Sequence, residues 1–167
     1  MRLPGAALAS TGGSAALLIA SLGLVAVVAA IGGVATSRGV GDWYDSLDRA
    51  PWNPPAWLFG PAWTILYVLM AVAAWLVTRE GLGDSPVRVA LTLYLVQLAL
   101  NLSWSIVFFG LRRPGLALVV IGALFVAIAA TAIAFHGIAP TAAWLLVPYL
   151  VWVAFAASLN AWIAFAN

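Results

Sequence analysis

Cysteine is absent from the 167 residues, and charged residues are scarce. Without thiols the chain can form no disulfide, thiolate nucleophile, iron–sulfur cluster or Cys-ligated haem. Charged residues make up 7% of the chain, whereas a typical soluble domain carries about 25%. All seven basic residues are arginines, and no run of them is dense enough to indicate nucleic acid as a partner.

Hydrophobic residues make up 65% of the chain and form long runs. A bilayer core of about 30 Å needs about 20 apolar residues as a helix, because only helices and closed barrels satisfy their backbone in lipid. We therefore predict an all-α membrane protein, a single domain over residues 14–165 that follows an N-terminal extension, 1–13. Its five transmembrane helices are expected at about residues 14–36, 59–79, 88–110, 115–135 and 141–165.

The interiors of these five runs hold no Asp, Glu, Lys or Arg, since Arg79 and Arg88 stand only at run ends. Coupled transporters normally keep an ionisable residue within a span, so ion-driven pumping is not expected. The apolar run after Arg2 resembles a secretory signal peptide, but it is longer than such signals, so we expect a retained first span. The arginine distribution slightly favours placing the first and third loops in the cytoplasm.

The loop over residues 41–57 contains the stretch WYDSLDRAPWNPPAW, with three tryptophans and three prolines. Tryptophan, tyrosine and proline provide rigid surface at low entropic cost. We predict that this loop folds back as a lid over one mouth of the helix bundle. An interfacial belt at the lipid headgroups would also explain the tryptophans, although not the prolines.

Polar and aromatic side chains form stripes at helical spacing in three of the predicted spans. Residues four apart share one helix face, and these stripes, if they converge, line a cavity suited to a flat apolar ligand. Gln97 and Asn101 have a simpler alternative, which is to bond neighbouring helices to each other. The stripes are Trp63 and Tyr67; Gln97, Asn101, Trp104 and Ser105; and Tyr149, Trp152, Ala156 and Asn160.

Three blocks of sequence resemble the translocator protein family, also called tryptophan-rich sensory proteins or peripheral benzodiazepine receptors. They are the loop and helix start WYDSLDRAPWNPPAWLFGPAWTILY, the segment from Gln97 to Gly110, and the segment from Val147 to Asn160. The blocks occur in the family's order and at its spacings. One departure is visible, because the family's Lys-Pro step reads Arg49-Ala50-Pro51 here.

The resemblance implies a protein that binds protoporphyrin, haem and related flat ligands beneath the loop, for transport, sequestration or sensing. It also implies a homodimer. We expect no required cofactor and no metal site, and an integral multi-pass location in a bacterial cell-envelope membrane. Arg49 would meet a ligand carboxylate or pair with Asp45 or Asp48. The candidate binding residues are Tyr44, Arg49, Pro54, Trp63, Tyr67, Gln97, Asn101, Trp104, Tyr149, Trp152 and Ala156.

Two other functions remain open. Family members are associated with light-dependent porphyrin breakdown attributed to tryptophans that match Trp63 and Trp152, although no acid–base or nucleophile constellation is present. A sterol is the other possible ligand, but the family's sterol motif ends in a basic residue that is missing after Asn160. We therefore expect cholesterol to bind more weakly than protoporphyrin.

Three residue groups have simple structural interpretations. Asp42, Asp45 and Asp48 are spaced as a solvated helix face rather than as metal ligands, and the single His136 is expected to be solvated rather than bound to haem iron. Small residues on the fourth span offer a face for close helix packing, either in a dimer or inside the bundle. They are Gly115, Gly122, Ala123 and Ala127.

Overall fold

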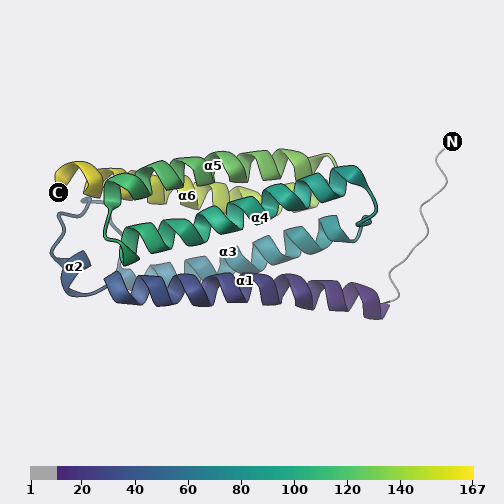
Figure 1. Ribbon diagram of the computed structural model, residues 1–167, viewed down its shortest axis with the longest axis horizontal. Coiled ribbons are helices and arrows are strands. Elements are labelled where there is room, and N and C mark those ends of the chain that lie inside the picture. The colour runs from purple at the N-terminus through teal and green to yellow at the C-terminus, as the bar shows by residue number, and fades with distance from the viewer. Residues whose placement is uncertain (1–10) are drawn as a thin grey trace.

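The computed structural model describes residues 11–167 as a bundle of long helices (Figure 1). Within this part of the chain, five helices are long and apolar enough to cross a membrane, which confirms the predicted fold class. The elements in chain order are α1 (Thr11–Gly39), α2 (Asp42–Asp45), α3 (Ala56–Thr78), α4 (Ser85–Ser105), a π-helix (Ile106–Gly110), α5 (Pro114–His136) and α6 (Pro140–Ala166).

The helix ends, with the π-helix counted as part of α4, differ from the sequence-based expectation by up to three residues, and two of these differences affect the expected extension and lid. α1 begins at Thr11, within the expected extension 1–13, and residues 1–10 lie outside the described part of the chain. α3 begins at Ala56, so the last two residues of the expected lid are helical. The lid ends early because Pro55 holds an extended backbone with ψ of 142°, after which the helix can start at once.

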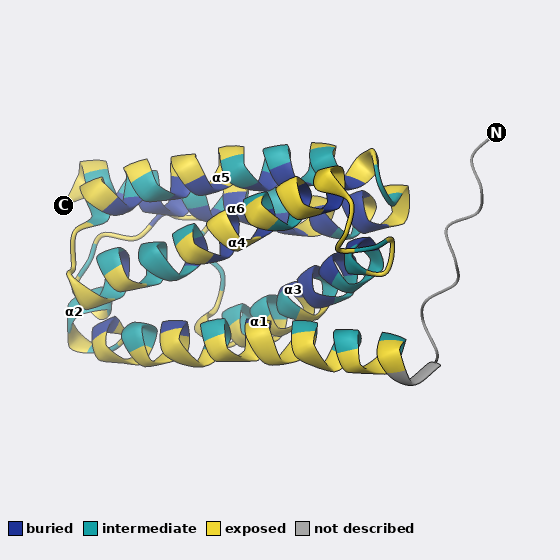
Figure 2. Cartoon of the chain, turned by 45° about the vertical axis from the view of Figure 1, so that its right-hand side comes forward, coloured by how far each residue is buried: buried dark blue, intermediate teal, exposed yellow. Residues whose placement is uncertain are grey.

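The five long helices form a closed ring around a common core. Each packs mainly against two neighbours, in the cyclic order α1, α3, α6, α5, α4 and back to α1, and α3 also contacts α4 across the ring. Buried residues lie between the helices and exposed residues on their outer faces (Figure 2). α1 has the smallest buried share of the five and is the most peripheral. Apolar outer faces are expected here, because lipid solvates them as well as protein does.

The small residues of the fourth span lie mostly on the outside of this ring. Gly115, Gly122 and Ala123 on α5 are exposed, so they do not pack inside the bundle. The interpretation of this face as a bundle contact is therefore wrong for these three residues. Its use by a second copy of the chain stays a prediction.

The loop between α1 and α3 covers one end of the bundle, where Figure 1 also places the C-terminus. The backbone nitrogen of Asp48 donates to the side chain of Asn167 at 2.9 Å, and Asn167 donates back to the Asp48 carbonyl at 3.2 Å. The indole nitrogen of Trp52 donates to Ser158 at 3.3 Å, and its ring meets Trp162 edge-on at 5.3 Å. These contacts confirm that the loop is a lid attached to the end of α6.

A π-helix at the lid end of α4 was not foreseen from the sequence. Leu111 donates its backbone N–H to the carbonyl of Ile106 at 2.8 Å, which widens the last turn by one residue. The end of α1 packs directly on this turn at Gly39. A methyl group added to Gly39 would lie 2.5 Å from the Phe109 carbonyl oxygen and 2.8 Å from its Cα, so no side chain fits there.

We expect Gly39→Ala to force the end of α1 away from the π-helix and to lower the free energy of unfolding by about 1–3 kcal/mol. Gly23→Ala is the matched control, because a methyl group there meets nothing within 4 Å on the same helix. Thermal unfolding of both variants in one detergent checks this. Equal melting temperatures would contradict the close packing of α1 on the π-helix.

Candidate ligand-binding cavity

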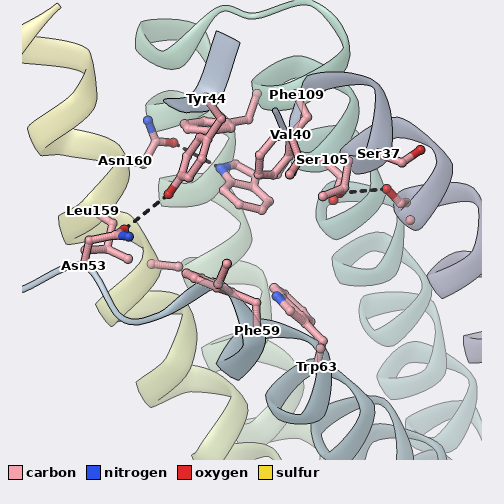
Figure 3. A pocket seen from close by; sticks show the side chains of 18 of the residues that line it. Ser37, Val40, Tyr44, Asn53, Phe59, Trp63, Ser105, Phe109, Leu159 and Asn160 are labelled. Atoms are coloured by element: carbon pink, nitrogen blue, oxygen red, sulfur yellow. Dashed lines mark hydrogen bonds between the residues drawn. The ribbon is translucent and has the colours of Figure 1, made fainter. Parts of the chain in front are cut away.

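A cavity of about 660 Å³ lies beneath the lid, at the lid end of the ring (Figure 3). Its walls come from α1, α3, the lid end of α4 with the π-helix, and α6, whereas α5 contributes no lining residue. The volume lies within the range of about 300–1,000 Å³ that is typical of pockets for drug-sized ligands.

Aromatic rings form the deeper walls of the cavity. Phe59, Trp63 and Tyr67 follow one another at four-residue spacing on α3, so all three side chains lie on the same face. The ring of Phe59 meets Trp152 of α6 edge-on at 5.9 Å, and Trp63 lies 5.6 Å from Tyr67. The indole nitrogen of Trp152 is shielded from solvent and has no hydrogen-bond partner among residues 11–167.

A second aromatic group joins the lid to the π-helix. Phe108 stacks on Trp104 at 5.4 Å, and the consecutive Phe109 meets the same indole edge-on at 5.9 Å. Trp43 packs on Phe108 at 5.8 Å, and Tyr44 packs on Phe109 at 5.9 Å. The wider π-turn thus lets two neighbouring phenylalanines face one side and support the lid from below.

Asn101 fixes the floor of the cavity from beneath. Tyr67 donates its hydroxyl to Asn101 Oδ1 at 2.9 Å, and Asn101 Nδ2 donates to the hydroxyl of Tyr149 at 2.9 Å. One amide therefore links α3, α4 and α6. Asn101 is only 1% exposed, and at this depth no water replaces a lost partner.

A second amide sets the position of Trp104. The indole nitrogen of Trp104 donates to Asn160 Oδ1 at 3.1 Å, and Asn160 Nδ2 donates to the carbonyl of Pro114 at 2.8 Å. Asn160 lies in the cavity wall and is 2% exposed. The Asn160 side chain therefore connects α6 both to the Trp104 indole of α4 and to the first residue of α5.

Among the described residues, the charged groups that line the cavity are confined to the lid. Asp45 and Arg49 form an ion pair at 3.4 Å, and the Arg49 guanidinium lies 5.4 Å from the centre of the Tyr44 ring. Tyr44 donates its hydroxyl to Asn53 Oδ1 at 3.2 Å. Burial raises the pKa of this hydroxyl, while Arg49 and the bond to Asn53 lower it, and the net shift is upward, so Tyr44 stays a neutral donor at neutral pH.

Seven of the eleven candidate binding residues line the cavity. They are Tyr44, Arg49, Trp63, Tyr67, Trp104, Trp152 and Ala156. The other four do not: Pro54, Gln97, Asn101 and Tyr149. Asn101 and Tyr149 lie one layer below the floor, because they bond each other and the back of the aromatic wall.

Gln97 and Pro54 lie outside the cavity for different reasons. Gln97 is buried one turn below Asn101, where its amide nitrogen meets the sulfur of Met70 at 3.9 Å and its oxygen has no described partner. For Gln97 and Asn101 the structure thus favours the alternative of contacts between helices. The Pro54 carbonyl accepts a bond from the side chain of Asn53, within the lid.

His136 is exposed at the far end of α5, away from the cavity.

Several lining residues were missed by the sequence analysis. Phe59 could have been found, because it lies four residues before Trp63 on the same face. The α1 residues Gly32, Gly33 and Thr36 line the cavity too, but small residues scattered through an apolar run give no periodic signal. Asn53 was overlooked among the prolines of the lid, although it carries the bond from Tyr44.

Asn101→Leu is expected to leave the hydroxyls of Tyr67 and Tyr149 without this partner and to lower the free energy of unfolding by about 1–3 kcal/mol. Gln97→Leu is the matched control, since this amide lies one turn away on α4, is equally buried, and makes only a weak sulfur contact among described residues. Unfolding titrations of both variants measure the difference. An equal loss in both would show that Asn101 has no special role.

The sequence over residues 21–166 matches the TspO/MBR family. It is 42% identical over 139 residues to the tryptophan-rich protein TspO of Chlorobaculum tepidum, covering 83% of this chain and 88% of that one. It is 45% identical over 130 residues to the translocator protein of Bos taurus, covering 77% of each chain. It is 43% identical over 137 residues to the tryptophan-rich sensory protein of Cereibacter sphaeroides, covering 80% and 84% respectively.

Proposed function

The chain belongs to the TspO/MBR family of integral, multi-pass membrane proteins, and from this premise we propose that it binds protoporphyrin or haem in the cavity beneath the lid. In this proposal the bound tetrapyrrole is carried, sequestered or sensed. The proposal is carried by a deep aromatic cavity with a cation at its lid, Arg49, the one basic side chain among the described residues that line it.

The walls suit the flat, apolar body of a tetrapyrrole. Trp63 and Trp152 present large rings from two facing helices, and each ring contact with a conjugated ligand contributes about 1 kcal/mol beyond burial. The cavity volume of about 660 Å³ allows a ligand of this class. The unpartnered indole N–H of Trp152 is a donor that a polar ligand atom could satisfy after a small ring movement.

The lid suits the acidic edge of the same ligand. Arg49 is paired with Asp45, but the two side chains are 39% and 66% exposed, so this pair contributes little to stability. A ligand carboxylate can therefore replace Asp45 as the partner of Arg49 at small cost. The guanidinium donates two parallel hydrogen bonds to a carboxylate, which a single exposed contact at 3.4 Å does not provide.

Arg49→Gln is expected to weaken protoporphyrin binding by about tenfold, equivalent to about 1.4 kcal/mol. The dimethyl ester of protoporphyrin, which has no carboxylate, should bind the variant and the wild type equally. Tryptophan-fluorescence titrations in nanodiscs measure both ligands. Arg79→Gln is the control, because Arg79 lies at the far end of α3 over the ring of Trp75. Equal losses for acid and ester would rule out a carboxylate contact.

Light-driven porphyrin breakdown is a second candidate function, favoured by the presence of both Trp63 and Trp152 in the cavity wall. The oxidisable side chains among the described lining residues are indoles and phenols, so the chemistry would depend on the excited porphyrin and oxygen together with these rings.

If breakdown occurs, Trp63→Phe and Trp152→Phe should retain most of the binding, because a phenyl ring still packs on the ligand. Both should slow the loss of porphyrin absorbance under illumination. Trp144→Phe is the matched control, since this tryptophan is 68% exposed on α6 and does not line the cavity. Identical rates in the wild type, all variants and empty nanodiscs would leave binding as the sole activity.

A further inference from the structure

The walls of the cavity are closed on three sides and incomplete on the fourth. On α6 and on α4 with the π-helix, every lining residue is buried or half-buried. The exposed lining residues of the long helices are confined to α3 and to the end of α1 with the adjoining Val40. They are Gly33, Ser37 and Val40, and Ala56, Gly60 and Thr64.

These exposed residues border the gap between α1 and α3, which are neighbours in the ring. The opposite side of α3 is shut, because Phe59 and Trp63 pack against Trp152 and Tyr149 of α6. The opposite side of α1 is shut as well, since Gly32 packs near Ser105 of α4. The cavity therefore communicates with the outer face of the bundle between α1 and α3.

Protein atoms do not fill this gap at its two glycines. A Cβ atom added at Gly33 or at Gly60 would meet nothing within 4 Å, although both residues line the cavity. The six exposed lining residues form the rim of this gap, and the glycines and the alanine among them leave room that larger side chains would occupy. This open space contrasts with Gly39 on the same α1 helix, where an added Cβ would collide with Phe109.

The rim is compatible with lipid although it contains hydroxyl groups. Thr64 donates to the Gly60 carbonyl at 2.9 Å, Ser37 to the Val34 carbonyl at 2.9 Å, and Thr36 to the Gly32 carbonyl at 2.9 Å. Each hydroxyl is thus satisfied within its own helix and presents no unpaired donor to the bilayer. An apolar molecule passing the rim breaks no bond between helices.

The lid, by contrast, is held in place. Asn167 makes two hydrogen bonds to the backbone of Asp48, and Trp52 is bonded to Ser158 and packed on Trp162. Raising the lid would break all of these contacts. α1 itself is fixed near both ends, at Gly39 on the π-helix and through the bond from Trp75 to the Ser14 carbonyl at 2.9 Å.

We propose that the ligand enters and leaves the cavity sideways from the bilayer, through a portal between α1 and α3 bordered by Gly33 and Gly60. The portal fits an amphipathic ligand dissolved in the membrane, with its flat body at the depth of the rim and its acidic edge at headgroup level beside Arg49. The assignment of an acidic ligand rests on the proposed function, whereas the portal itself rests on the cavity walls.

The absence of cysteine makes a ligand-independent test possible, because one introduced cysteine is then the only thiol. Ala156→Cys places it in the cavity wall on α6, where Ala156 is 7% exposed. In nanodiscs, a membrane-partitioned pyrene maleimide should label this cysteine. Adding Gly60→Leu should slow labelling by about tenfold or more, a factor that corresponds to a barrier only about 1.4 kcal/mol higher.

Two controls separate the portal from other routes. Gly23→Leu adds the same bulk at an open, exposed position of α1 outside the cavity, and it should leave the labelling rate unchanged. Asn167→Ala removes two contacts of the lid and should also leave the rate unchanged. Labelling that is insensitive to Gly60→Leu, or that accelerates with Asn167→Ala instead, would overturn the portal.

The same variants then address the ligand. In stopped-flow measurements with protoporphyrin, Gly60→Leu should slow both association and dissociation, because the added side chain narrows the opening through which the ligand passes. Unaltered rates in a variant whose maleimide labelling is slowed would contradict passage of the ligand through the portal. A wild-type protein that binds no protoporphyrin would refute the proposed function, while the labelling experiment would still decide the portal.

Discussion

The structure depends on one constraint, which is that a polar group buried between membrane helices must find its partner within the protein. Asn101 meets this constraint by joining the hydroxyls of Tyr67 and Tyr149, and so holds α3, α4 and α6 at one depth. The ring of helices closes below this point and opens above it into the cavity. Asn160 plays the same part nearer the lid, where its buried amide makes two hydrogen bonds between helices and fixes Trp104 in the cavity wall.

Above this floor the side chains that line the cavity change from apolar to charged toward the lid. Its deep part is aromatic and apolar, and its charged groups, Asp45 and Arg49, lie at the lid. The side between α1 and α3 is lined by small residues that leave space open. Floor, lid and side opening together favour a flat ligand with one acidic edge that is soluble in the membrane. A similar gradient is found in the bilayer itself, from an apolar interior to polar headgroups.

Much of this could be predicted from the sequence, because lipid makes the pattern simple. Long uncharged runs predicted five spans, and four-residue spacing placed Trp63 and Tyr67 on one inward face. The same spacing predicted an inward face for Asn101, but it could not show that the tyrosines of two other helices would take up its hydrogen bonds. The π-helix at Phe108 and Phe109 depends on packing against the lid and on Gly39, and is not encoded in local spacing. Glycine has no side chain and so gives no periodic signal, which is why the portal side was missed.

The central claim is that one acidic, flat ligand occupies this cavity. An equilibrium titration of the protein in nanodiscs with protoporphyrin, followed by quenching of tryptophan fluorescence and compared with empty nanodiscs, tests it most directly. We expect saturation at one ligand per chain, and loss of the saturable phase when Ala156→Trp fills the buried wall of the cavity. A non-saturating, partition-like response, identical in both proteins, would contradict the account.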